Sequence, residues 1–339
     1  MSAERSREWR LVARPRGEPA DSDFELAEVD VPEPEDGQLV IRNSWISVDP
    51  YMRPRMNDAK SYVPPYRLGE PMLGGAAGRV VSSRNERFPE GAWVSHGLGW
   101  REWSVSDGRG VAVVDPSRAP LQAYLGALGM PGLTAFVGID DIGAVREGET
   151  VFVSAAAGAV GSAAAQIARI RGARVIGSAG SAAKVAWLEE LGLDAAFDYK
   201  QAAVRDALRE LAPDGIDVYF DNVGGDHLEA AISSLKSFGR VVACGSISVY
   251  NATEAPVAPR NLHQVVTKRL RYQGFIVMDH WDRMPAFHGE AAGWVADGRL
   301  RWRETVVDGI EHALDAFRGL LHGDNVGKML VRVGPTPDD

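Results

Sequence analysis

The pattern of hydrophobic and polar positions changes near residue 124 of the chain. Before that point, short apolar runs alternate with Gly, Pro and polar residues, which is typical of short antiparallel strands joined by tight turns. We expect strands at 24–26, 38–42, 78–81, 92–94 and 111–114. Their spacing predicts a compact, mostly antiparallel β domain.

After residue 124, apolar strand patterns alternate with helical ones, which predicts parallel βαβ units with right-handed crossovers. The expected elements are strands at 150–154, 173–178, 195–198, 216–221, 239–245 and 270–277, with a long helix near 282–297. A last apolar strand at 328–333 is too short to form a domain alone. We therefore predict an α/β protein with two domains. A doubly wound parallel-sheet Rossmann domain spans 125–305, and the β domain spans 1–124 and is completed by 306–339.

The segment from Val151 to Gly161 predicts a nucleotide-binding turn, because a buried strand breaks into small residues and continues as a helix through Ile170. The turn contains the pattern A-x-G-x-x-G, beginning at Ala156. Glycine at 158 lets the backbone approach a pyrophosphate, and the helix N-terminus supplies N–H groups and a positive dipole end. The usual first glycine is Ala156 here, so a strand–helix turn without a ligand is the alternative.

The residues after the second strand of this domain favour NADP(H) over NAD(H). An NAD enzyme normally carries Asp or Glu there to bind the ribose hydroxyl, whereas this chain has the sequence Ser-Ala-Gly at 178–180. The missing carboxylate removes a repulsion that a 2′-phosphate would meet, and Lys184 could pair with that phosphate. The alternative for Lys184 is a solvated lysine on a helix face.

Composition and charge exclude several classes of protein. The 339-residue chain has a net charge of -9 without a long basic block, so we expect no nucleic-acid partner. Because no apolar run approaches a membrane span and residues 1–8 lack an apolar signal core, we expect a cytoplasmic protein that does not associate with membranes. A single cysteine, Cys244, and histidines without ligand spacing predict no metal site. We expect His96 to be a satisfied core or loop residue.

Several segments occur in the order of one known family. They are Val48–Arg53, Leu68–Met72, Gly129–Ala135, Ala156–Gly161, Tyr219–Gly225, Cys244–Asn251 and Asn325–Lys328. Over almost its full length the chain resembles the zinc-independent medium-chain dehydrogenase/reductase group. That group contains the leukotriene hydroxydehydrogenase/prostaglandin reductases, the plant double-bond (alkenal) reductases and the curcumin reductases. The resemblance implies a GroES-like fold for the N-terminal β domain and a homodimeric assembly.

The resemblance also implies the residues that bind NADP(H). Lys184 and Tyr199 would hold the 2′-phosphate, although Tyr199 could instead be a surface residue of a strand–helix loop. The pyrophosphate would lie on Gly158, Ala159, Val160 and Gly161. The nicotinamide half would be lined by Asn222, Cys244, Gly245, Ser246, Ile247, Ser248, Phe275, Ile276, Val277 and Asn325.

The reaction implied by the resemblance is NADPH-dependent reduction of the C=C bond of a small α,β-unsaturated aldehyde or ketone. Hydride addition at Cβ leaves an enolate, and Tyr250, just past a strand end, is the candidate that stabilises or protonates it. We assign Tyr51, Met130 and Pro131 to the substrate pocket. Family members carry Gly where this chain has Pro54, whose fixed φ could reshape the loop of Tyr51.

Two other functions stay open. In a quinone reductase of the wider superfamily, the hydride would go to a quinone ring. The same fold could also serve a protein that binds NADPH without turnover.

Overall fold

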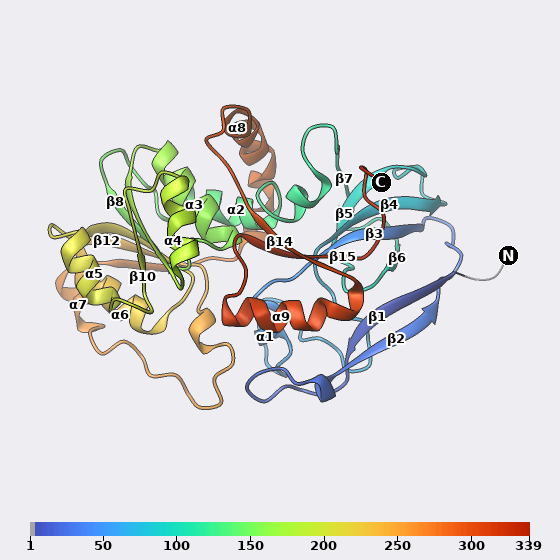
Figure 1. Cartoon of the computed structure of the whole chain (residues 1–339), viewed down its shortest axis with the longest axis horizontal. Coiled ribbons are helices and arrows are strands. Elements are labelled where there is room, and N and C mark those ends of the chain that lie inside the picture. Colours follow the sequence, from blue (N-terminus) through green and yellow to red (C-terminus); the bar gives the residue numbers. More distant parts are fainter. Residues whose placement is uncertain (1–3) are drawn as a thin grey trace. The chain divides into compact units, whose positions relative to one another are not determined.

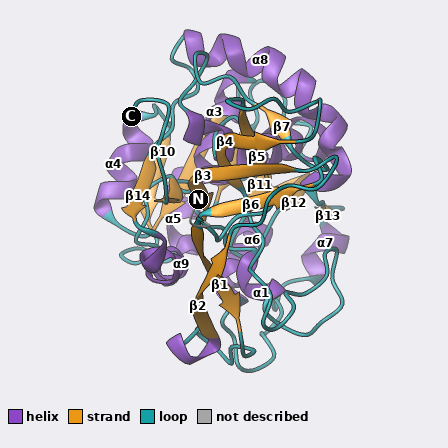
Figure 2. Ribbon diagram, turned by 90° about the vertical axis from the view of Figure 1, so that its right-hand side faces the viewer, coloured by secondary structure: helices purple, strands orange, loops and turns teal. Residues whose placement is uncertain are grey.

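The computed structural model describes residues 4–339, which divide into two compact units. The first unit extends to Gly126 and resumes at Glu304–Asp339, and the second unit is Ala127–Arg303. Figure 1 traces the chain through both units, and Figure 2 distinguishes their helices from their strands.

The first unit is built mainly from antiparallel strands. β1 (Arg5–Leu11) and β2 (Phe24–Asp30) form an antiparallel pair. A seven-stranded sheet has the order β14 (Glu304–Asp308), β15 (Lys328–Arg332), β3 (Leu39–Ser47), β4 (Ala76–Ser83), β5 (Trp93–His96) and β7 (Ala112–Val113), with β6 (Trp103–Ser106) paired to β3. β14 and β15 pair in parallel, and the other strand pairs of this sheet are antiparallel. The antiparallel β fold predicted for this part of the chain is confirmed.

An aromatic and aliphatic core fills the first unit. Trp100 and Phe317 are fully buried and meet edge to face, with ring centroids 6.0 Å apart. Phe317 belongs to α9 (Ala313–His322), whose buried residues recur at helical spacing. The short helix α1 (Met52–Arg55) adds the buried side chain of Met52 to the same cluster. Burying one such side chain contributes roughly 1.5–3 kcal/mol, so this core holds α1 and α9 in place.

The second unit is a doubly wound parallel sheet, as predicted. Its strand order is β10 (Ala195–Asp198), β9 (Arg174–Ala179), β8 (Thr150–Val153), β11 (Ile216–Asp221), β12 (Leu235–Ala243) and β13 (Arg271–Gly274). Its helices are α2 (Met130–Val137), α3 (Ala159–Ile170), α4 (Ala182–Glu190), α5 (Val204–Leu211), α6 (Gly225–Ser234), α7 (His263–Thr267) and α8 (Met284–Ala296). The strand order reverses between β8 and β11, and such switch points are where open α/β sheets bind ligands.

Some predicted element boundaries were wrong. The strand expected at 270–277 ends at Gly274, and the apolar residues after it enter a 3-10 segment at Val277–Arg283. The helix expected near 282–297 begins at Met284. The sequence pattern did not indicate β1, β6 or β14, because their buried and exposed positions depend on the strands beside them.

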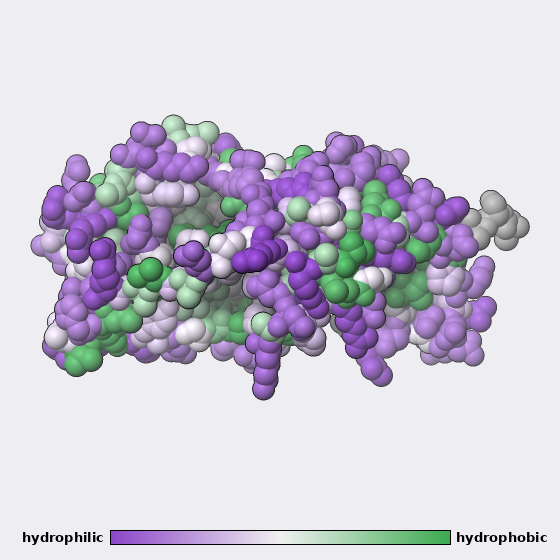
Figure 3. Space-filling view, turned by 90° about the horizontal axis from the view of Figure 1, so that it is seen from below, coloured by the Kyte–Doolittle hydropathy of each residue, from purple (hydrophilic) through white to green (hydrophobic). Residues whose placement is uncertain are grey.

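Hydrophilic residues cover most of the face shown in Figure 3, where apolar side chains form separate patches. Within residues 4–339, no helix has the length and apolar character needed to span a membrane.

Candidate functional site

The turn between β8 and α3 has the shape of an anion-binding cradle. Ala155 adopts a positive φ of 47°, and Gly158 is the N-cap of α3. A side chain at Gly161 would overlap the carbonyl oxygen of Ala155, so only glycine allows the helix to begin this close to its strand. The N–H groups of Ala159, Val160 and Gly161 are the first of the helix and have no carbonyl partner within it. They can therefore donate to a phosphate oxygen.

A second cluster forms where β9 meets α4. Ser181 caps α4 and accepts a hydrogen bond from the main-chain N–H of Lys184. Tyr199, just past β10, donates its main-chain N–H to Ala179 O at 3.0 Å. Its phenol oxygen lies so close to Gly180 that a Cβ added there would be 2.9 Å away. Gly180 and Tyr199 thus lie in contact, and Lys184 follows in the first turn of α4, with no carboxylate at residues 178–181.

His227 is a further member of this cluster, and no sequence pattern indicated it. Its ring packs edge-on against Tyr199, with centroids 5.0 Å apart and an interplanar angle of 78°. Burial lowers the pKa of His227 to about 4, so its ring is neutral at pH 7. A lone histidine near the start of a helix gives no sequence signal, because only the fold places it against Tyr199.

Two loops meet at the carboxyl ends of β11 and β12. The main-chain N–H groups of Cys244 and Gly245 both donate to Asp221 O at 2.9 Å. The N–H of Ile247 donates to Asn222 O, and the N–H of Ser248 donates to Val223 O, each at 3.2 Å. These main-chain hydrogen bonds fix the loop at 244–250 to the loop that follows β11. This brings Asn222 together with the segment from Cys244 to Tyr250.

Tyr250 ends the second of these loops. The main-chain N–H of Ser246 donates to its phenol oxygen at 3.4 Å. A Cβ added to Gly245 would lie 3.3 Å from the same oxygen, so glycine leaves room for the phenol. Burial raises the pKa of the nearby Cys244 thiol to about 12. Cys244 is therefore protonated at pH 7 and unsuited to act as a nucleophile.

The other sequence-predicted residues of the second unit lie at the ends of elements. Phe275, Ile276 and Val277 are half-buried and come directly after β13 instead of within it. Met130 and Pro131 open α2 after the N-cap Gly129, a position at which proline needs no N–H partner.

Tyr51 and Asn325 belong to the first unit. Tyr51 is the N-cap of α1, and burial, reinforced by the charge of Asp49, raises the pKa of its phenol well above the usual value. Pro54 lies within the first turn of α1, where its fixed φ suits the helix. Asn325 is buried and donates its side-chain N–H to Gly327 O at 2.7 Å.

His96 is the satisfied core residue that we expected. Its Nδ1 accepts the main-chain N–H of Leu98 at 3.1 Å, so its Nε2 carries the proton and donates to Asn43 Oδ1 at 3.0 Å. Burial lowers the pKa of His96 to about 3. Over the described range 4–339, His, Cys, Asp and Glu side chains form no group of three or more that could hold a metal ion.

Comparisons with known proteins match both units. Residues 7–114 match the family model described as the N-terminal domain of oxidoreductase, and residues 159–292 match the one described as zinc-binding dehydrogenase. The NADPH-dependent curcumin reductase of Escherichia coli (strain K12) is 41% identical, over 97% of this chain and 97% of the relative. Prostaglandin reductase 1 of Mus musculus is 43% identical, over 96% of this chain and 99% of the relative.

A solved structure agrees with these relatives. The crystal structure of CurA in complex with NADPH from Vibrio vulnificus superimposes with a TM-score of 0.92 at 40% identity. The match covers 97% of this chain and 99% of that one.

Proposed function

Because the chain belongs to the medium-chain dehydrogenase/reductase family of curcumin and prostaglandin reductases, we propose that it is an NADPH-dependent reductase of conjugated C=C bonds. Its substrates are small α,β-unsaturated aldehydes and ketones. The second unit serves as the dinucleotide-binding domain, and the first serves as the substrate domain. The chain acts as a cytoplasmic homodimer.

The observation that carries the cofactor assignment is the cluster of Gly180, Lys184 and Tyr199. Residues 178–181 place no negative charge beside it, and Lys184 supplies a positive one, so the 2′-phosphate of NADPH is favoured there. The cradle at the start of α3 fits the pyrophosphate, because Gly161 lets the helix begin against the turn and its first N–H groups point outward. When bound, the nicotinamide supplies the hydride.

The residues of the chain act on the carbonyl end of the substrate. Tyr250 donates its O–H to the oxygen on which negative charge develops, and a donor placed this way is worth about 3–4 kcal/mol of barrier. The N–H of Ser246 donates to the same phenol oxygen, which makes the phenol a better donor. In the second unit, Asn222, the loop at 244–248 and residues 275–277 line the nicotinamide half, and Asn325 of the first unit is assigned to the same cofactor. Within the first unit we assign Tyr51, whose phenol stays protonated, to substrate binding, and within the second unit we assign Met130 and Pro131 to it.

The reaction in this proposal uses no zinc. A catalytic zinc site needs three protein ligands, and a thiolate site within one chain needs more cysteines than the single Cys244. Polarisation by hydrogen bonding suits conjugate reduction, in which the enolate needs only a donor at its oxygen.

The test compares enones, enals and quinones as substrates of the purified full-length chain. The reaction is monitored by the loss of NADPH absorbance. We expect enones and enals to be reduced with a higher kcat/KM than quinones, and NADPH to be preferred over NADH. A higher kcat/KM for quinones would make the chain a quinone reductase. NADPH oxidation no faster than without protein would leave a binding protein without turnover.

A further inference from the structure

A buried chain of hydrogen bonds lies directly beneath the loop that follows β11. Ser154, at the end of β8, and Tyr219, within β11, are both fully buried. The oxygen atoms of their side chains are 3.0 Å apart, and Tyr219 Oη lies 2.7 Å from Asp221 Oδ1. None of these three side chains belongs to the sites described above, and the proposed reaction does not use them directly.

The direction of donation along these hydrogen bonds follows from the number of protons available. A phenol has one proton, and the carboxylate of Asp221 is a pure acceptor, so Tyr219 donates to Asp221. With its proton committed to Asp221, Tyr219 can only accept from Ser154, whose oxygen also accepts the main-chain N–H of Asn222 at 3.0 Å. Ser154 also lies near Asp221 and near Phe220 O, the latter at 3.4 Å.

This series of hydrogen bonds starts and ends beside the same loop, the one that follows β11. It begins at the N–H of Asn222 and ends at Asp221 Oδ1, which also accepts the N–H groups of Val223 at 2.9 Å and Gly224 at 2.7 Å. Hydrogen bonds that are linked in this way polarise one another, and a closed arrangement fixes its members more firmly than separate pairs. Burial raises the pKa of Asp221, which its hydrogen-bond donors oppose.

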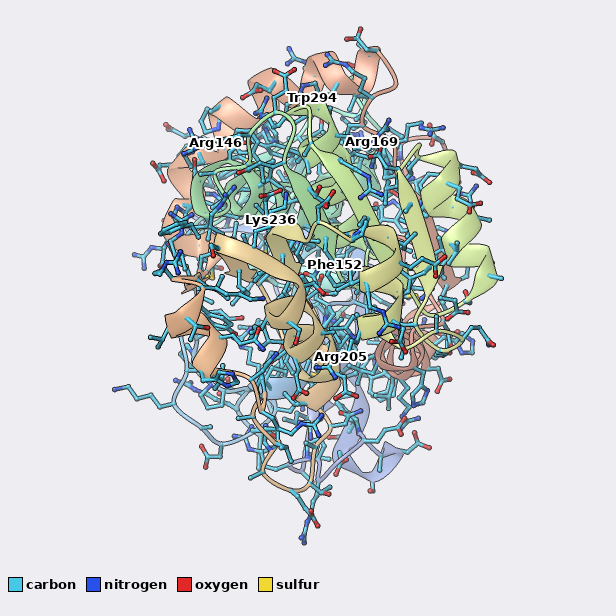
Figure 4. The ribbon with its side chains drawn as sticks, turned by 90° about the vertical axis from the view of Figure 1, so that its left-hand side faces the viewer. Arg146, Phe152, Arg169, Arg205, Lys236 and Trp294 are labelled. Carbon is cyan, nitrogen blue, oxygen red and sulfur yellow. The ribbon has the colours of Figure 1, made fainter. Side chains whose placement is uncertain are left out.

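The aromatic ring of Tyr219 is itself held in place. It stacks on Phe152 with centroids 5.0 Å apart and an interplanar angle of 13°, and Phe152 stacks on Phe197. Figure 4 labels Phe152 among the strands and helices of the second unit. The stack leaves the hydroxyl of Tyr219 at the carboxyl end of its strand, pointing at the loop.

From this geometry we infer that Ser154 and Tyr219 are positioning residues for Tyr250. Carbonyl oxygens of Asp221, Asn222 and Val223 accept hydrogen bonds from four of the main-chain N–H groups of the loop at 244–250, those of Cys244, Gly245, Ile247 and Ser248. The loop that carries Tyr250 is therefore only as well placed as the loop that follows β11. This inference rests on the proposed function for its effect on turnover, but the placement itself can be measured without substrate.

The kinetic test is a double-mutant cycle of Tyr219→Phe and Ser154→Ala in the full-length chain. We expect kcat for an enone to fall about fivefold in each single variant and no further in the double variant, because either change breaks the same series of hydrogen bonds. With NADPH deuterated at nicotinamide C4, the isotope effect on kcat should rise. The Kd for NADPH should stay within about twofold, because neither the Ser154 nor the Tyr219 side chain is assigned to a phosphate. A double-variant loss equal to the product of the two single losses would overturn the inference.

The structural test is amide hydrogen exchange in the protein without NADPH. We expect Tyr219→Phe to speed exchange of the amides of Cys244, Gly245, Ile247 and Ser248. The control Tyr272→Phe, on the exposed strand β13, should leave exchange of these amides unchanged. Ser154→Ala removes the other end of the same series of hydrogen bonds. It replaces Tyr219→Phe in this test if that variant does not fold. Unchanged exchange in a folded variant overturns the inference. If the wild-type protein reduces no enone, the proposed function fails. Amide hydrogen exchange still tests whether Ser154 and Tyr219 position the loop at 244–250.

Discussion

Lys328 and Asp49 form an ion pair inside the first unit, with Lys328 Nζ 2.7 Å from Asp49 Oδ1 and both side chains more than nine-tenths buried. Lys328 also donates to Val48 O at 2.8 Å, and Ser47 Oγ donates to the second carboxylate oxygen of Asp49. The pair joins β15 to the turn that leads into Tyr51 and α1. A buried pair of charges gains little net stability over apolar residues, but the removal of one partner leaves the other charge uncompensated.

Lys328→Met should therefore lower the free energy of unfolding by about 3–5 kcal/mol, measured by urea denaturation. The double variant Lys328→Met/Asp49→Leu should recover most of that loss. The control is Lys236→Met, whose partner Asp217 lies 2.8 Å away in a more exposed pair, where we expect a loss of no more than about 1 kcal/mol. Equal losses at Lys328 and Lys236 would mean that burial of the pair is unimportant.

Lys184→Ala should raise the KM for NADPH about tenfold and change the KM for NADH much less. The ammonium group is proposed to pair with the 2′-phosphate, which NADH lacks, and a charge-assisted hydrogen bond is worth about 1.5–3 kcal/mol. Steady-state kinetics with both cofactors measure the difference. Lys60→Ala, at an exposed position of the first unit, is the control. Equal effects on the two cofactors would remove the assignment.

Tyr250→Phe should lower kcat for an enone by about 10²-fold while the Kd for NADPH stays nearly constant, since the phenol acts on the developing enolate. Stopped-flow measurement of NADPH oxidation separates hydride transfer from product release. Tyr272→Phe serves as the matched control. A variant with the wild-type rate would show that Tyr250 only packs.

Incubation with a strong chelator should leave enone reduction unchanged. The chain has a single cysteine, and the proposed chemistry places a hydrogen-bond donor where a zinc enzyme places its metal. Elemental analysis of the purified protein provides the second measurement. Stoichiometric zinc, or activity lost to the chelator and restored by zinc, would refute the metal-free mechanism.

Stability should fall as the pH decreases below about 6.5, in part because of His96 and His227. Burial lowers their folded-state pKa values to about 3 and about 4, so the unfolded state binds more protons between those values and 6.5. Near pH 7 the folded and unfolded states are both mostly neutral at these rings, whereas at pH 4 the unfolded state has bound protons that the folded state binds weakly. Each ring therefore lowers the free energy of unfolding by roughly 3 kcal/mol between pH 7 and pH 4.

The measurement is urea denaturation of the wild type and of His227→Phe at pH 7 and at pH 4. The variant keeps an aromatic ring beside Tyr199 but has no proton to gain, so its loss between the two pH values should be smaller. The same loss in both proteins would show that His227 contributes nothing to the pH dependence.

The sequence by itself determined the fold class and the family. The alternation of strand and helix after residue 124 predicts a parallel sheet, because the spacing of apolar residues reflects which side of each element is buried. The sequence alone also indicated the glycines at 158 and 161 and the absence of an acid at 178–181. Both the approach of the backbone to a ligand and the local charge depend on the residue type at single positions.

Tertiary structure alone decided how those residues are supported. Lys328 and Asp49 are far apart in sequence and become one buried pair only because β15 joins the sheet of β3. His227 meets Tyr199, and Ser154 meets Tyr219, through strand order in the second sheet. Apolar periodicity encodes burial but not partners, so β13 was predicted too long and the contacts beneath the loops at 221–225 and 244–250 had no sequence signal.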